Sequence, residues 1–196
     1  PGGDGYNLAN IFIDGDNPSP STLNLEEIWT FSVVDSLFRD FKKEIGNVSS
    51  TYDMVGFSAG AQIVHRYLIY NTTANYNRVV AASAGWYTVP DNAIDFPYGL
   101  KISPQEGEDL SSLFAKQTYI IVGEEDVDPN TAALRHTPEA DAQGLQRVQR
   151  AQHFYQESRD IAVANAHPIN WIYKTVPNTG HDGEAMVNYA ADLLYN

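Results

Sequence analysis

The sequence predicts an α/β fold, a single domain in which a mostly parallel sheet is flanked by helices. Short apolar runs alternate along the chain with longer stretches of helical period, which is typical of parallel strands joined by right-handed helical crossovers. The strand-like runs show no polar alternation, as expected when helices cover both faces of a sheet. The chain has 196 residues, which fits one such domain, and we assign residues 1–196 to it.

The N-terminal quarter is expected to hold loops and then one helix. Residues 1–24 are rich in Gly, Asn, Asp, Ser and Pro, with one strand-like piece at residues 11–13. Thr30 then caps a helix that reaches about Ile45 and is stopped by Gly46. We expect this helix to bury one apolar stripe, made of Phe31, Val34, Leu37, Phe38, Phe41 and Ile45.

The rest of the chain alternates between strands and helices, with one irregular excursion at residues 87–116 that could form a cap or a pocket. Thr137 and Pro138 suit the N-cap and first residue of a long helix that reaches about residue 160. The final helix begins at Gly183 and is expected to bury Met186, Tyr189, Ala190 and Leu193. The expected strands are residues 53–57, 78–84, 119–123 and 171–176, with a helix at 59–70 and a short one near 110–114.

A Gly-x-Ser-x-Gly motif joins the first of these strands to the helix that follows it. This arrangement predicts a sharp turn with Ser58 at its tip, and Gly56 and Gly60 are expected where strand and helix backbones come too close for a Cβ. Ser58 is then a candidate nucleophile, and the Ala59 N–H at the helix start is a candidate donor to an oxyanion. The alternative is a plain strand-to-helix glycine turn.

Candidate partners for the serine follow the two later strands, at the sheet edge where parallel strands place their chemistry. His181 is the one histidine on a Gly-flanked loop just after a buried strand, which suits a general base. Asp126 lies three residues past Gly123 and is the favoured orienting acid, with Asp128 as the alternative. The order Ser, acid, His is that of α/β-hydrolases.

Other features exclude whole classes of function. A net charge of −13 disfavours nucleic acid and anionic membranes as partners. There is no cysteine, and no apolar run is long enough to span a bilayer. A calcium loop at Asp126 is set aside because Thr131 stands where that loop needs Gly, so no metal or cofactor is expected. Ser83 also ends a strand, but no helix follows it.

The chain resembles the α/β-hydrolase superfamily, and more closely a bacterial branch of serine esterases. Members of that branch carry a G-[HF]-S-A-G-A-Q elbow, an A-G-W-Y-T-x-P-D segment and a G-H-D-G-E-A histidine loop. These stand here at residues 56–62, 84–91 and 180–185. The resemblance implies Ser58, Asp126 and His181 as a catalytic triad. It also places Trp86 and Tyr87 near the substrate.

These observations predict a serine esterase that cleaves small or polymeric carboxylic esters through an acyl-enzyme. Trp86, Tyr87, Phe96 and Tyr98 are expected to wall the substrate pocket, with simple core packing as the alternative. A non-catalytic relative serving as a binding domain is the second hypothesis. A peptidase is a weaker third, because no basic residue lies near the motifs to hold a peptide carboxylate.

One departure from the superfamily concerns what precedes the elbow strand. Only about 50 residues lie upstream, too few for the further strands and the second oxyanion donor that this fold carries there. We therefore expect the elbow strand to lie at the edge of the sheet, and the chain to be part of a polypeptide longer by roughly 80–120 residues. The uncovered edge should pair with another chain, or with residues 10–13.

Overall fold

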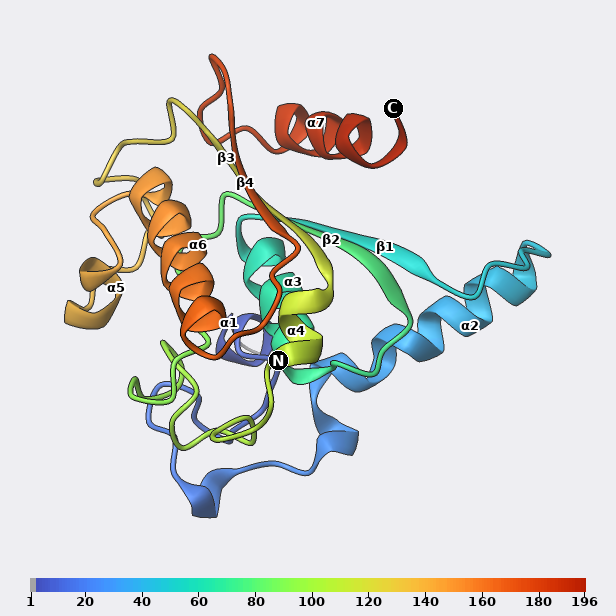
Figure 1. The fold of residues 1–196 in the computed structure, drawn as a ribbon, viewed down its shortest axis with the longest axis horizontal. Helices are drawn as coiled ribbons and strands as arrows, with labels where there is room; N and C mark the ends of the chain where they lie inside the picture. The colour runs from blue at the N-terminus through green and yellow to red at the C-terminus, as the bar shows by residue number, and fades with distance from the viewer. Residues whose placement is uncertain (1–2) are drawn as a thin grey trace.

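Four parallel strands form the centre of the structure, a computed structural model that describes residues 3–196 (Figure 1). The strands are β1 (Tyr52–Phe57), β2 (Tyr76–Ala82), β3 (Gln117–Gly123) and β4 (Trp171–Val176). They lie side by side in the order of the chain, and each pairs in parallel with the next. The predicted parallel α/β sheet is confirmed, and β1 is an edge strand of it.

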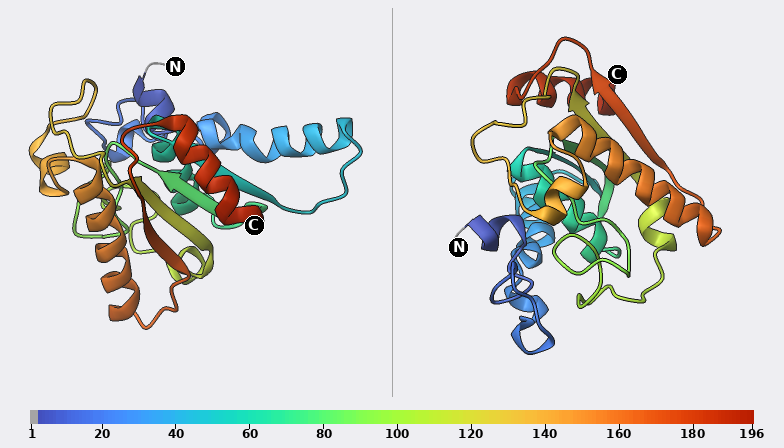
Figure 2. Two further views of the ribbon diagram at one scale, coloured as in Figure 1. Left: turned by 90° about the horizontal axis from the view of Figure 1, so that it is seen from above. Right: turned by 90° about the vertical axis from the view of Figure 1, so that its left-hand side faces the viewer.

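Helices cover both faces of this sheet. Helices α3 (Ala59–Tyr70) and α6 (Arg147–Ala164) pack on one face, α3 over β1 and β2 and α6 over β3 and β4. Helix α7 (Gly183–Tyr195) crosses the other face (Figure 2). The remaining elements are α1 (Gly3–Asn7), α2 (Val34–Glu44), α4 (Ser111–Ala115), α5 (Pro138–Ala142), and the 3-10 helices η1 (Pro20–Thr22), η2 (Glu26–Ile28) and η3 (Thr30–Val33).

The two central strands, β2 and β3, are buried on both faces because their side chains enter two separate cores. Val79, Ala81 and Ile120 point into the larger core under α3 and α6, while Val80 and Ile121 join the smaller core under α7. Both cores are fully apolar at these positions, which explains why the strand sequences show no polar alternation. The smaller core is completed by buried residues of α7, namely Met186, Ala190 and Leu194.

The N-terminal region differs from the sequence prediction in two places. Residues 3–7 form the short helix α1 where loop was expected, and residues 10–13 join no sheet. Phe12 makes only an isolated antiparallel bridge with Leu23. The edge of β1 is therefore not covered by residues 10–13.

The prediction of one buried helix from Thr30 to Ile45 is wrong in its start and in its burial. Helix α2 begins at Val34, after the 3-10 turn η3, and the Thr30 hydroxyl donates to the Gly5 carbonyl instead of capping α2. Phe31 is buried, but Leu37 and Phe41 are each 64% exposed. The stripe is covered only in part: Val34 packs against the larger core and Phe38 against Tyr52, while Leu37, Phe41 and Ile45 stay exposed where α2 extends away from the body of the molecule (Figure 1).

The long helix expected from Thr137 to about residue 160 is two helices. Thr137 caps α5 as predicted, its hydroxyl accepting from the Ala140 N–H. Gly144 then has φ +134°, a backbone conformation that L side chains rarely adopt, and the chain turns there before α6 begins. The bounds predicted for α3 and β4 are confirmed, and α7 begins at Gly183 as expected. Its last fully packed residue is Leu194, whereas Tyr189 and Leu193 are partly buried.

Candidate active site

Ser58 lies at the tip of a strained turn between β1 and α3. Its backbone has φ 54° and ψ −114°, an unusual conformation for a residue with a side chain. The Ser58 N–H donates to the Ala82 carbonyl of β2 over 2.9 Å, which fixes the turn against the neighbouring strand. Ala59 is the first residue of α3, so its N–H belongs to the first helical turn, where N–H groups have no acceptor within the helix.

Of the two glycines in the motif, only Gly56 is required by space. A Cβ at Gly56 would lie 2.3 Å from the Gly60 carbonyl oxygen, a backbone atom that cannot move aside. A Cβ at Gly60 would meet no atom within 4 Å. The expectation that both glycines are needed for backbone approach is therefore correct for Gly56 and wrong for Gly60.

This difference predicts opposite effects of alanine at the two positions. Gly56→Ala should lower the free energy of unfolding by about 3 kcal/mol, because strand and helix would have to separate. Gly60→Ala should leave it unchanged or raise it by up to about 1 kcal/mol, since alanine favours a helix over glycine. Urea unfolding of the two variants measures both values. A loss at position 60 as large as that at position 56 would contradict the spacing seen here.

The structure brings His181 and Asp126 to Ser58 from two other strand ends. His181 lies in the loop between β4 and α7, and its Nε2 is 3.0 Å from the Ser58 Oγ. Its Nδ1 is 2.7 Å from Oδ2 of Asp126, which follows β3. The Phe57 ring packs against the imidazole, with centroids 4.6 Å apart. In the tautomer that satisfies both contacts, Nδ1–H donates to Asp126 and Nε2 accepts from the Ser58 hydroxyl.

The two candidate acids have different surroundings. Asp126 is only 3% exposed and faces the histidine. Asp128 is exposed and accepts instead from the Asn130 N–H within its own loop. The geometry therefore favours Asp126 as the partner of His181.

A buried arginine holds the other oxygen of the Asp126 carboxylate. Arg147, the first residue of α6, donates from Nη1 to Oδ1 of Asp126 over 3.2 Å. The sequence analysis missed this residue because its partner lies 21 positions away. One local signal was available: a cation in the first turn of a helix opposes the helix dipole, and a nearby anion would offset this cost.

The four aromatic residues expected to wall the pocket are all buried. Tyr87 is 0% exposed and stacks on Phe154 in the core, a position that suits packing rather than a pocket wall. The guanidinium groups of Arg66 and Arg135 both lie over the Trp86 ring. Such contacts hold the indole in place.

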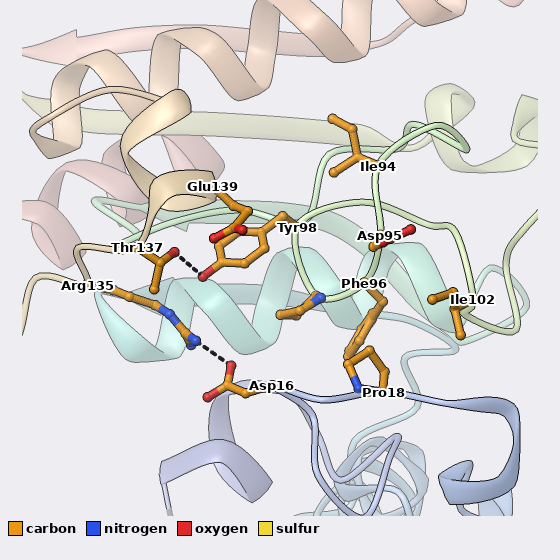
Figure 3. Close-up of a pocket in the computed structure, with 11 residues that line it drawn as sticks. Asp16, Pro18, Ile94, Asp95, Phe96, Tyr98, Ile102, Arg135, Thr137 and Glu139 are labelled. Carbon is orange, nitrogen blue, oxygen red and sulfur yellow. Dashed lines mark hydrogen bonds and ion pairs between the residues drawn. The ribbon is translucent and has the colours of Figure 1, made fainter.

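Phe96 and Tyr98 line a cavity of about 440 Å³ formed between residues 16–18, 94–102 and 135–139 (Figure 3). The Tyr98 hydroxyl bonds to that of Thr137, and Arg135 pairs with Asp16 across the cavity (Figure 3). Ser58 and its two partners are not among the residues that line this cavity. Trp86 adjoins this cavity, because its ring centroid lies 4.8 Å from that of Tyr98.

Two further residues near strand ends and helices, Ser83 and His65, have structural roles. Ser83 is fully buried at the end of β2, where its N–H donates to the Ile121 carbonyl. His65 is buried, and this burial holds the pKa of its imidazole well below the usual value. Its Nε2 accepts from the Thr88 N–H, which requires the neutral ring. Within residues 3–196, no group of three or more His, Cys, Asp or Glu is placed to hold a metal ion, and no helix is long and apolar enough to cross a membrane.

Comparison with known proteins finds relatives among solved structures. Poly(aspartic acid) hydrolase-1 from Sphingomonas sp. KT-1 is 36% identical with a TM-score of 0.89, and the match covers 99% of this chain and 72% of that one. LpqC, a poly(3-hydroxybutyrate) depolymerase from Bordetella parapertussis, is 31% identical with a TM-score of 0.89, over 100% of this chain and 64% of that one. No protein-family model and no curated sequence matches.

A more distant structure shares the fold alone. It is an IroE-like serine hydrolase from Shewanella oneidensis, 11% identical with a TM-score of 0.52, over 97% of this chain and 55% of that one. The fold, the nucleophile elbow and the two similar structures together show that the chain belongs to the α/β-hydrolase superfamily. It spans about two thirds to three quarters of the length of its two close relatives, both of which are hydrolases. That further strands precede residue 1 stays a prediction.

Proposed function

We propose that this protein is a serine esterase that cleaves carboxylic esters through an acyl-enzyme, with Ser58, His181 and Asp126 as its catalytic triad. The observation that carries the proposal is the continuous chain of hydrogen bonds from the Ser58 Oγ to His181 (3.0 Å) and on to Asp126 (2.7 Å). These are the contacts through which a base removes the serine proton and an acid orients that base.

In the proposed first step, the Ser58 Oγ attacks the ester carbonyl carbon while His181 Nε2 takes the hydroxyl proton. The oxyanion that forms is stabilised by the Ala59 N–H at the positive end of α3. The C–O bond to the alcohol then breaks, and the imidazolium gives its proton to the departing oxygen. A water molecule, deprotonated by the same histidine, hydrolyses the acyl-serine and restores the enzyme.

The negative charge of this protein favours an uncharged substrate, including an uncharged polyester chain. The two close relatives are named for polymers of opposite character, since poly(aspartic acid) is a polyanion and poly(3-hydroxybutyrate) is an uncharged ester. This chain carries a net charge of −13. Exposed carboxylates follow both strands that bring the partners to Ser58, namely Glu124, Glu125 and Asp128 after β3 and Asp182 and Glu184 after β4. A polyanion would be repelled there.

Two measurements test the proposal. A fluorophosphonate probe should label the wild-type protein at Ser58, identified by mass spectrometry of the labelled peptide. Hydrolysis of a p-nitrophenyl ester series should then show activity and its preferred acyl length, with oligomers of 3-hydroxybutyrate cleaved in preference to oligo-aspartate. A folded protein that takes no label and cleaves no ester would overturn the proposal, and would favour the non-catalytic binding domain instead.

We also propose that this chain self-associates through the face formed by edge strand β1 and helix α2. Strand β1 has no partner on its outer side within residues 3–196, and Val55 of β1 is 39% exposed. On α2, Phe41 lines a hollow together with Tyr52 and Asp53 of β1, and Leu37 and Phe41 are each 64% exposed. An open strand edge next to exposed apolar side chains is a template for pairing with another strand, so a second copy of the chain is the expected occupant.

Light scattering after size-exclusion chromatography should show a dimer or larger species at micromolar concentration. The double variant Leu37→Glu/Phe41→Glu should shift the mass to that of the monomer, because charge makes the apolar face costly to bury. Val163→Glu is the matched control, since Val163 is 66% exposed but lies alone on α6. A wild-type chain that stays monomeric throughout would contradict the prediction.

A further inference from the structure

We propose that Arg147 is a positioning residue of this site, which fixes the Asp126 carboxylate and thereby sets the pH range in which His181 acts as a base. The inference rests on the proposed function. It is drawn from the surroundings of Asp126, whose two carboxylate oxygens each have one partner. Oδ2 lies 2.7 Å from His181 Nδ1, and Oδ1 lies 3.2 Å from Arg147 Nη1.

The placement of Arg147 is costly for the fold. Its side chain is 4% exposed and that of Asp126 is 2% exposed, so two charges are removed from water. As the first residue of α6, the guanidinium also lies at the positive end of the helix dipole. Its Nε has no hydrogen-bond partner among the described residues, so no second polar contact accounts for this position. A sequence breaks such local rules mainly where function requires it.

A second buried cation makes the position still less favourable. Arg150 lies nearly one turn further along α6, and burial lowers the pKa of its guanidinium, with Asp141 opposing this effect and Arg147 adding to it. Arg150 has its own acceptors, the carbonyls of Gly85 and Gly144 and the carboxylate of Asp141. Arg147 is therefore the cation that donates to Asp126, whereas Arg150 donates to backbone carbonyls, including that of Gly85 in the loop after β2.

The contact has a geometric consequence. A carboxylate turns readily about its last side-chain bond, so one hydrogen bond to the imidazole leaves its plane poorly defined. With Arg147 holding Oδ1, Oδ2 stays directed at His181 and the ring stays directed at Ser58. Loss of that contact should lower turnover roughly tenfold to a hundredfold, as small misplacements of catalytic groups do.

The contact also has an electrostatic consequence. When His181 accepts the serine proton it becomes a cation, which Asp126 stabilises and Arg147 opposes. Removing the Arg147 charge should make the imidazolium hold its proton more strongly. The acid limb of the kcat/KM profile then moves to higher pH, by about one unit for a charge a few ångströms beyond the carboxylate.

Other charged or titratable groups surround this pair: Arg150 on α6, Tyr87 after β2, Tyr173 on β4, and the exposed carboxylates that follow β3 and β4. Tyr87 lies near Asp126 and Arg147 from the segment after β2, and burial raises the pKa of its hydroxyl, so it stays neutral throughout the range. Tyr173 of β4 acts electrostatically on Tyr87, and Glu124 after β3 acts on Tyr173 in turn, so neither acts directly on Asp126. Glu124 accepts a hydrogen bond from Thr175 rather than from the histidine. Arg147 is thus the cation in direct contact with Asp126.

The test compares Arg147→Met, Arg147→Lys and the matched control Arg150→Met. Two readouts are followed against pH: kcat/KM on a p-nitrophenyl ester, and the imidazole C–H resonance of His181, assigned by its loss in His181→Ala. Arg147→Met should move the pH midpoint of the kcat/KM profile and that of the His181 resonance upward by about one pH unit. Arg147→Lys keeps the charge and should leave them nearly in place. Arg150→Met should move them by less than half as much.

Two outcomes would overturn the inference: no change in the pH midpoints of Arg147→Met, or equal shifts in Arg147→Met and Arg150→Met. A residue with only a structural role lowers turnover without shifting the acid limb of the kcat/KM profile. If Arg147→Met does not fold, Arg147→Gln keeps a donor to Asp126 without the charge and gives the same two outcomes. The resonance titration needs no substrate. An inactive wild type would therefore refute the proposed function, while the titration still decides the role of Arg147.

Discussion

Ser58→Ala should abolish ester hydrolysis. The loss expected for a triad nucleophile is about a millionfold in turnover, because the alanine side chain has no oxygen that could form the acyl-enzyme. The measurement is kcat on the best p-nitrophenyl ester found in the series, together with labelling by the fluorophosphonate probe. The variant should take no label and should keep the fold, since alanine fits the space of serine at the tip of the turn.

Ser83→Ala is the matched control for this experiment. Ser83 also follows a parallel strand and also has a positive φ, of 51°. Its hydroxyl is buried and has no hydrogen-bond partner in the described chain. Removing it should therefore leave most of the activity and the full label. Similar activity in the two variants would show that Ser58 is not the nucleophile.

The parts of the fold that sequence could predict are those set by local pattern. The change from an apolar run to a helical period at Ser58 marks both the end of β1 and the start of α3, and both are observed there. Asp126 and His181 could be found because parallel strands end at one edge of the sheet, so residues directly after two strands meet. These inferences need no knowledge of distant contacts.

The parts that could not be predicted depend on neighbours far along the chain. The period of α2 indicates an apolar stripe but not whether anything covers it, and in residues 3–196 nothing covers Leu37 or Phe41. The break between α5 and α6 depends on a positive φ at Gly144, and a glycine also fits within a helix. The role of Arg147 depends on a contact with Asp126 across 21 residues, which no spacing rule contains.

Asp126→Asn should also lower turnover strongly, and Asp128→Asn should lower it little. An asparagine at 126 presents an amide that no longer fixes the His181 tautomer with Nδ1–H toward the side chain and Nε2 free for Ser58. A comparable change in a serine protease lowers kcat about ten-thousandfold. Asp128 is exposed and bonds within its own loop, so its loss leaves the histidine unaffected.

The two effects must be separated from stability, because Asp126→Asn also leaves Arg147 buried without its anion. Breaking a buried ion pair in this way typically costs about 3–5 kcal/mol. Turnover should therefore be expressed per folded molecule, with the folded fraction taken from a urea or thermal unfolding curve of each variant. When expressed per folded molecule, the kcat of Asp126→Asn should still be about four orders of magnitude below wild type. The kcat of Asp128→Asn should stay within a few fold of wild type. A larger loss in Asp128→Asn than in Asp126→Asn would transfer the orienting role to Asp128, against the 2.7 Å contact between Asp126 and His181.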